Sequence, residues 1–303
     1  MKRLSVLLLS ELCILFVLLF VIHHFALDYR VRRIIAKHDA VLSGDSLVVR
    51  GIENAQLERA SGLRVCKVAW NGAGVYGSAC AHTYASELGK LHLSGISYPM
   101  LNRKLDLDYN RYPFRPSIIL RFMNAGFPIK ELLRICVQSV GWEISVIPSP
   151  SRPLPKLAFL HRNNLDTPIR EALDLKELED YEEMACAAES GLTNFHERFR
   201  PLVATVEENR LDREIFFRLQ TSKMLNDIIA TTAPSQAELV HAELEGLSKS
   251  VIFVGEFIDG SKPDQYYFSD LTHLNVRGRA LATEELARKV RDALSLQSLQ
   301  SGL

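Results

Sequence analysis

Three short apolar runs, each with a glycine within two residues of its end, constrain the fold of this chain most strongly. They cover residues 40–42, 64–70 and 90–96. Short apolar runs bounded by turn residues are typical of buried strands. Residues 76–88, between the second and third runs, carry apolar side chains at helical spacing. Because strands and helices alternate, the pattern predicts an α/β fold with a parallel sheet that is covered on both faces.

Later segments extend this pattern. Residues 129–140 are predicted to be helical, and the apolar, β-branched residues 142–147 are predicted to form a fourth strand before the proline-rich stretch 148–155. Residues 251–258 predict a fifth strand, and residues 276–294 predict an amphipathic terminal helix. We therefore expect a mainly parallel, five-stranded sheet.

The composition changes between about residues 173 and 247. Glu, Leu, Ala, Arg and Lys dominate there at helical spacing, and Gly and Pro are scarce. These residues favour helix, so we expect two to four helices that form a cap bordering a cleft. The predicted α/β domain then covers residues 38–303, interrupted at about 150–247 by a mostly helical insertion, and a single domain of this size is ordinary.

The N-terminus carries a long apolar run. Lys2 and Arg3 precede residues 4–27, which are long enough to cross roughly 30 Å of hydrocarbon as a helix. No small-residue cleavage site comes after the run, so we predict an uncleaved transmembrane anchor over residues 1–27 and a basic juxtamembrane stretch over 28–37. Glu11 lies inside the run; we expect it near the membrane interface, and the alternative is a contact with an integral-membrane partner.

The charges around this run support two opposite orientations in the membrane. The four basic residues in 28–37 outnumber Lys2 and Arg3, which by charge counting places the domain in the cytoplasm. A short basic tail before an apolar run also resembles a signal anchor, which exports the domain on its C-terminal side. Charge counting alone leaves the orientation open.

Composition removes several functional classes. The 36 basic and 36 acidic residues balance, so there is no basic excess of the kind that nucleic-acid binding needs. The cysteines show no zinc-binding spacing, and neither do the histidines and carboxylates, so we expect no metal and no cofactor. Four cysteines come after the apolar run, as buried thiols, which we favour, or in up to two disulfides: Cys66, Cys80, Cys136 and Cys186.

Gly44-Asp45-Ser46 lies directly after the first predicted strand. A nucleophilic serine is best held there, because a tight turn and the N-terminus of the next helix expose the hydroxyl and direct backbone N–H groups at developing negative charge. The alternative is a glycine turn in which Asp45 or Ser46 only caps a helix.

A second motif precedes the last predicted helix. Asp270 and His273 are three residues apart, followed by Leu274, Asn275 and Gly278. At this spacing the carboxylate can accept a hydrogen bond from one ring nitrogen while the other faces a hydroxyl, which fixes the tautomer and stabilises the imidazolium. The alternative is a helix-capping Asp270 beside an incidental histidine.

The two motifs together resemble the SGNH/GDSL hydrolase superfamily, over about residues 38–148 and 248–297. The resemblance implies a flavodoxin-like α/β fold with Ser46 as nucleophile, His273 as general base and Asp270 as its orienting partner. It also implies an oxyanion hole made by the backbone N–H groups of Ser46 and of Gly74 or Gly72.

One part of the family pattern is missing. The family usually has an asparagine after the third strand as a further oxyanion donor, and here that place reads Gly95-Ile-Ser-Tyr-Pro99. Ser97 is the candidate replacement, with Asn71 and Asn102 as alternatives. Losing one oxyanion donor costs about 10²–10³ in rate, so a modest enzyme, a divergent transferase and an inactive relative all stay open.

Membrane-anchored relatives that handle acyl groups on envelope polymers share the apolar anchor, the short third block and the His-Leu-Asn ending. The resemblance therefore implies a serine esterase or O-acyltransferase that acts on an envelope polysaccharide or an acyl donor. It also places a single-pass protein in the inner membrane, with the catalytic domain in the periplasm or outside the cell. The alternative is a catalytically weak or inactive protein that serves as an assembly partner in an envelope complex.

Overall fold

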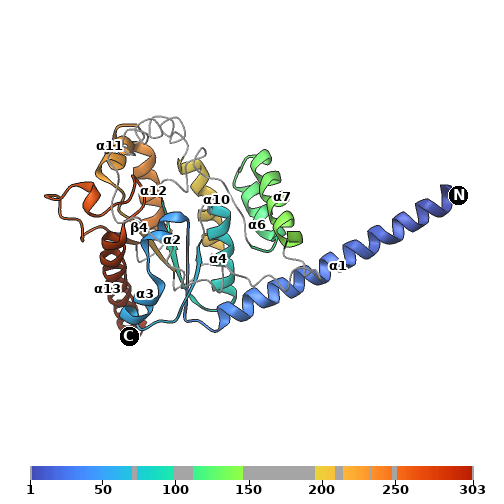
Figure 1. The fold of residues 1–303 in the computed structure, drawn as a ribbon, viewed down its shortest axis with the longest axis horizontal. Coiled ribbons are helices and arrows are strands. Elements are labelled where there is room, and N and C mark those ends of the chain that lie inside the picture. The colour runs from blue at the N-terminus through green and yellow to red at the C-terminus, as the bar shows by residue number, and fades with distance from the viewer. Residues whose placement is uncertain are drawn as a thin grey trace.

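The computed structural model describes residues 2–69, 74–97, 112–145, 195–208, 214–232, 234–247 and 251–301 (Figure 1). The strands are β1 (Ala40–Gly44), β2 (Val65–Ala69), β3 (Leu91–Gly95), β4 (Glu214–Leu219) and β5 (Val251–Val254). The helices before β4 are α1 (Lys2–Ala36), α2 (Ser46–Gly51), α3 (Asn54–Ser61), α4 (Val75–Glu87), α6 (Pro116–Asn124), α7 (Ile129–Ser145) and α10 (Phe195–Glu208). The later helices are α11 (Lys223–Thr232), α12 (Pro234–Leu247), the 3-10 turn η2 (Asp264–Tyr266) and α13 (Val276–Ser301).

The five strands form one parallel sheet in the order β2-β1-β3-β4-β5. The predicted five-stranded parallel sheet is confirmed, and this strand order is the flavodoxin-like one among doubly wound folds. The chain passes from β1 to β2 on one side and then returns to β3 on the other. Ligands of such sheets bind at the carboxyl ends of the strands where the order reverses, which here is between β1 and β3.

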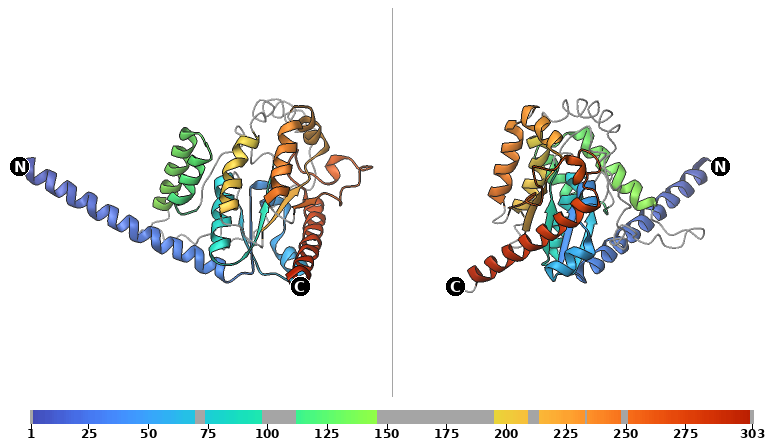
Figure 2. Two further views of the ribbon diagram at one scale, coloured as in Figure 1. Left: turned by 180° about the vertical axis from the view of Figure 1, so that it is seen from behind. Right: turned by 60° about the vertical axis from the view of Figure 1, so that its left-hand side comes forward.

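Alternating strand residues contribute side chains to two hydrophobic cores, one on each face of the sheet. Val41 and Phe216 point to the core under α4 and α10, whereas Leu42 and Phe217 point to the core under α3 and α13. Successive strand side chains face opposite sides of a sheet, so strands that are apolar throughout require helices on both faces. Figure 2 shows these helix layers on opposite sides of the sheet.

The fourth strand is not where the sequence predicted it. Residues 142–145 continue α7, and residues 146–147 lie outside the described part. The buried Glu143 side chain lies 3.1 Å from His24 Nδ1 of α1, a contact that a strand reading of 142–147 does not anticipate. The fourth strand is β4, inside the segment expected to be helical, whose described part otherwise forms α10, α11 and α12. A six-residue strand is hidden when composition is averaged over a long helix-rich segment.

Residues 4–27, the predicted anchor, belong to α1, which extends away from the sheet (Figure 1). The last turns of α1 pack on the domain through the buried side chains of Leu27, Val31 and Ile35. Across the described residues, no helix has both the length and the apolar character required to cross a membrane, which differs from the predicted transmembrane anchor.

Cys66, Cys80 and Cys136 carry thiols. Cys66 and Cys80 are buried, and burial raises the pKa of the Cys80 thiol to about 12. Such a thiol stays protonated and unreactive at neutral pH. Cys186 lies outside the described residues.

Candidate active site

A tight turn between β1 and α2 presents Ser46. Gly44 has φ +152°, and a Cβ atom there would lie 2.3 Å from Val48 Cγ2. Both the backbone conformation and the lack of space therefore require glycine. Asp45 caps α2, because its side chain accepts a hydrogen bond from the Leu47 N–H at 2.9 Å. Ser46 is therefore the first residue of α2, at the carboxyl end of β1, as the sequence predicted.

A closed loop before α13 presents His273. The Ser269 N–H donates to the His273 carbonyl at 2.8 Å, and the Asn275 N–H donates to the Tyr267 carbonyl at 2.9 Å. The Asn275 side chain accepts from the Gly278 N–H at 3.0 Å and so caps α13. These bonds explain the Asn-x-x-Gly spacing: asparagine starts the helix and bonds the glycine amide three residues on.

The two motifs meet at the carboxyl edge of the sheet. His273 Nε2 lies 2.8 Å from Ser46 Oγ, across 227 residues of sequence. His273 Nδ1 lies 2.8 Å from Asp270 Oδ2. The structure therefore brings all three predicted residues into one hydrogen-bonded chain, with the nucleophile–base distance that proton transfer requires.

Asp270 is held by several donors at once. Its Oδ1 accepts from the backbone N–H groups of Thr272 at 2.9 Å and His273 at 2.7 Å. Burial raises the pKa of Asp270, but the hydrogen bond and charge of His273 and these backbone donors outweigh burial and lower the pKa to about 2. An ionised Asp270 keeps the proton of His273 on Nδ1, which leaves Nε2 free to accept the Ser46 hydroxyl proton.

Arg50 is a neighbour that the sequence reasoning missed. Its Nη1 atom lies 4.0 Å from Asp270 Oδ2, and its Nε is buried without a hydrogen-bond partner in the described part. Arg50 comes four residues after Ser46 on α2, so the two side chains share a helix face. That spacing is the signal that points to Arg50.

Two predicted oxyanion donors are described at the same edge. Ser46 begins α2, where helical N–H groups lack an intrahelical acceptor. Gly74 begins α4 as its N-cap, just beyond the carboxyl end of β2, the strand beside β1. Gly72, Asn71 and Asn102 lie outside the described residues.

Ser97, the candidate replacement for the family asparagine, is used elsewhere. Its hydroxyl donates to Asp45 Oδ2 at 2.5 Å, and both side chains are buried. Burial raises the pKa of Asp45, which the hydrogen bonds from Ser97 and the Leu47 N–H only partly offset. The Ser97 hydroxyl therefore stabilises the turn that carries Ser46, because it donates a hydrogen bond to Asp45, the N-cap of α2.

A surface pocket of about 500 Å³ lies between α11 and η2, and none of its lining residues belongs to the triad. It is lined by Lys223, Met224, Asp227, Thr231 and Asp264. The Ser222 N–H donates to the Leu271 carbonyl at 3.1 Å, which ties the start of α11 to the loop that carries Asp270 and His273. Part of the helix-rich segment thus contacts this loop.

Comparison with protein-family models and with curated proteins finds no match for this chain.

Proposed function

We propose that this protein is a serine esterase or O-acyltransferase of the SGNH type. The observation that supports this proposal best is the chain of hydrogen bonds from Ser46 through His273 to Asp270, at 2.8 Å in each step. The motifs that carry the family resemblance are the same ones that form this chain.

The reaction is derived from the positions of these atoms. As Ser46 Oγ attacks an ester carbonyl carbon, His273 Nε2 takes the hydroxyl proton, and Asp270 stabilises the resulting imidazolium. In this proposal the N–H groups of Ser46 and Gly74, at the starts of α2 and α4, stabilise the oxyanion. His273 then gives its proton to the departing alkoxide as the ester C–O bond breaks, leaving an acyl-serine. Water or a sugar hydroxyl attacks the acyl carbon and gives its proton to His273. As the bond between the acyl carbon and Ser46 Oγ breaks, His273 returns this proton to Oγ and Ser46 is regenerated.

The substrate class rests on the family resemblance. Relatives with an apolar N-terminal run and a His-Leu-Asn ending act on envelope polymers, so we assign an acyl ester of an envelope glycan. The pocket beside α11 is one place for sugar hydroxyls, since Lys223, Asp227 and Asp264 add charged hydrogen-bonding groups to its lining.

One observation favours the second candidate function, an inactive assembly partner. The hydroxyl that replaces the family asparagine is bonded to Asp45 rather than directed at a substrate. An oxyanion hole with one donor fewer is slower by about 10²–10³. The same geometry therefore fits a slow enzyme, or a protein that keeps the fold to bind a partner.

Hydrolysis of p-nitrophenyl acetate by the full-length chain tests the proposal. Ser46→Ala and His273→Gln should each lower kcat by about 10³–10⁶, and the double variant should lose little more, because the residues of a triad act as one unit. Ser117→Ala, which changes an exposed serine on α6, is the matched control and should keep wild-type activity. A Ser46→Ala variant within tenfold of wild type would exclude the mechanism. A folded wild-type chain without any hydrolysis would favour the assembly partner.

A further inference from the structure

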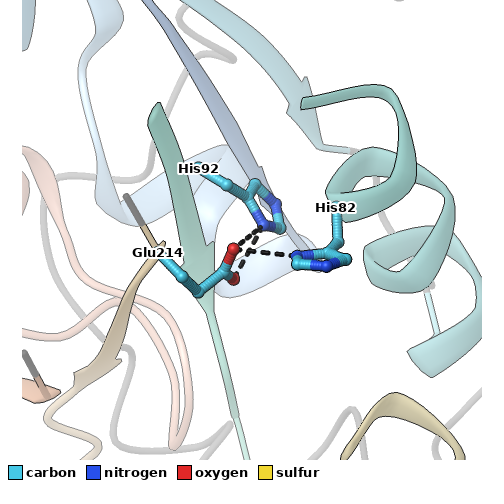
Figure 3. A group of neighbouring side chains, drawn as sticks. All are labelled: His82, His92 and Glu214. Carbon is cyan, nitrogen blue, oxygen red and sulfur yellow. Dashed lines mark hydrogen bonds and ion pairs between the residues drawn. The ribbon is translucent and has the colours of Figure 1, made fainter. Parts of the chain in front are cut away.

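A second group of titratable side chains lies inside the fold, between α4 and the sheet (Figure 3). His92 of β3 and Glu214 of β4 are register partners, so their side chains leave the sheet on the same face. His82 reaches them from α4. The side chains of both histidines are 0% exposed and that of Glu214 is 2% exposed.

The donor atoms of these three residues converge on one point. His82 Nδ1 lies 2.9 Å from Glu214 Oε2, and His92 Nδ1 lies 2.8 Å from Glu214 Oε1. One ligand atom from each residue falls within 4.8 Å of the other two. Two imidazole nitrogens and a carboxylate are a donor set that zinc prefers.

The orientation of His92 is fixed from outside the cluster. Ser43 Oγ on β1 lies 2.8 Å from His92 Nε2, so hydrogen bonding at Nε2 turns Nδ1 towards Glu214. Histidines that bind a metal through one nitrogen almost always hydrogen-bond through the other. Ser43 supplies that outer bond from within the buried layer.

The surroundings of the cluster contain more polar groups than their described neighbours satisfy. The hydroxyls of Ser78 and Ser94 are buried and have no hydrogen-bond partner within the described ranges. Ser78 precedes His82 by one turn of α4, and Ser94 lies two residues after His92 on the same face of β3. Buried hydroxyls without partners are uncommon, and each calls for an explanation such as an ordered water or ion.

The buried carboxylate also favours a nearby cation. Glu214 lies in a core made of side chains such as Ala79 and Phe216, where little water can solvate its charge. Burying a net charge is strongly unfavourable unless an opposite charge lies close to it. We propose that His82, His92 and Glu214 bind a divalent transition-metal ion of the zinc type, which ties α4 to β3 and β4.

The geometry accommodates this ion with small shifts. Ligand atoms about 2.0–2.2 Å from a tetrahedral zinc lie about 3.3–3.5 Å apart. The present nitrogen–oxygen distances of 2.8 and 2.9 Å therefore have to open by about half an ångström. Both carboxylate oxygens of Glu214 lie within 3.0 Å of His92 Nδ1, so the carboxylate can use one oxygen or both. The positions 82, 92 and 214 show no local sequence motif, since the site is assembled by the parallel pairing of β3 with β4 and by the packing of α4 on the sheet.

Metal content of the full-length chain tests the proposal. Bound metal is removed from the protein with a chelator, and the protein is then dialysed against zinc. Elemental mass spectrometry measures the zinc bound per chain. We expect one zinc ion per chain, visible d–d absorption when cobalt replaces zinc, and a melting temperature that falls with chelator and recovers with zinc. His82→Gln and Glu214→Gln should abolish all three responses. His38→Gln, which alters a histidine bonded to the end of α1, is the matched control and should keep them.

Wild-type measurements alone decide the question if a variant fails to fold. The proposal would be overturned if the wild-type chain retains no zinc after loading and its melting temperature changes with neither chelator nor zinc. Equal zinc content in wild type and a folded His82→Gln variant would also overturn it, because the ion would then be bound elsewhere. Either result leaves the cluster as a hydrogen-bonded histidine–glutamate group.

Discussion

Asp270 shows how one side chain serves both the fold and the proposed reaction. Its carboxylate accepts backbone N–H groups that close the 268–274 loop, and the same carboxylate orients His273. Ser97 and Asp45 form a similar pair on the other side of the site, where a buried hydroxyl bonds the residue that caps α2. Asp270 accepts from donors of its own loop, whereas Asp45 accepts from the nearby Leu47 N–H and from the distant Ser97. The positions of Ser46 and His273 therefore depend on these two carboxylates.

The lowered pKa of Asp270 has a consequence for acid stability. Its pKa in the fold is about 2, whereas an aspartate in an unfolded chain has a pKa of about 3.9. The ionised carboxylate therefore stabilises the fold above about pH 4, and this contribution is lost as the pH falls from about 4 to about 2. A difference of nearly two pKa units corresponds to about 2–3 kcal/mol. Asp270→Asn should lower the free energy of unfolding at neutral pH and lose less of it between pH 4 and pH 2 than wild type.

Denaturant unfolding at several pH values, on both chains, measures this effect. Asp292→Asn, which removes an exposed carboxylate from α13, is the matched control for the change in charge. If Asp270→Asn and wild type lose the same stability between pH 4 and pH 2, the Asp270–His273 interaction is weaker than the geometry indicates.

At the level of elements, the start of α13 packs tightly against the loop that carries Asp270 and His273. A Cβ atom on Gly278 would lie 2.2 Å from the Tyr267 carbonyl oxygen, and this contact is with backbone, which cannot rotate away. The side chain of a larger residue would push α13 and the 268–274 loop apart. The position of His273 therefore depends on a glycine five residues further along the chain.

Gly278→Ala should destabilise the protein by about 1–3 kcal/mol, as overpacking usually does, and should also reduce ester hydrolysis. Gly246→Ala is the matched control, because a Cβ atom there meets nothing within 4 Å and the residue lies in α12. That change should be neutral or stabilise by about 0.5–1 kcal/mol. Thermal unfolding of both variants measures the difference. Equal melting temperatures would show that α13 approaches the loop less closely than described.

The sequence predicts those elements and site residues whose pattern is local. β1, β2 and β3 are short apolar runs ended by turns, and Ser46, Asp270 and His273 stand in motifs of three to nine residues. β4 was missed because six strand residues are surrounded by helix formers, and residues 142–145 were misassigned because apolar, β-branched residues occur in both helices and strands. The hydrogen bond between Ser97 and Asp45 and the His82–His92–Glu214 cluster both depend on which strands pair. Strand pairing cannot be predicted from a short sequence motif.

At the scale of the whole molecule, the catalytic edge and α1 belong to the same body. α1 packs on the α/β domain through its last turns, and Asp28 near its end accepts a hydrogen bond from the Tyr84 hydroxyl of α4 at 2.7 Å. Upstream of this contact α1 carries large exposed apolar side chains, among them Ile14, Ile22 and Phe25. The proposed envelope substrate requires that the domain be exported.

Fusion of alkaline phosphatase after Leu303 tests the location. We expect an active phosphatase, because its disulfides form only in an oxidising compartment. A cytoplasmic reporter fused at the same position is the paired control and should be inactive. The opposite pattern would place the domain in the cytoplasm, and the envelope-glycan substrate class would have to be abandoned with it.

The central claim is that Ser46 is a nucleophile activated by His273. Treatment of the full-length chain with a fluorophosphonate, followed by peptide mass spectrometry, tests it most directly, because this reagent is attacked only by activated nucleophiles. We predict a covalent adduct on the peptide that contains Ser46, absent in Ser46→Ala, much slower to form in His273→Gln and unchanged in Ser117→Ala. A folded wild-type chain without an adduct, or an adduct that forms on Ser46 equally fast in His273→Gln, would contradict the account.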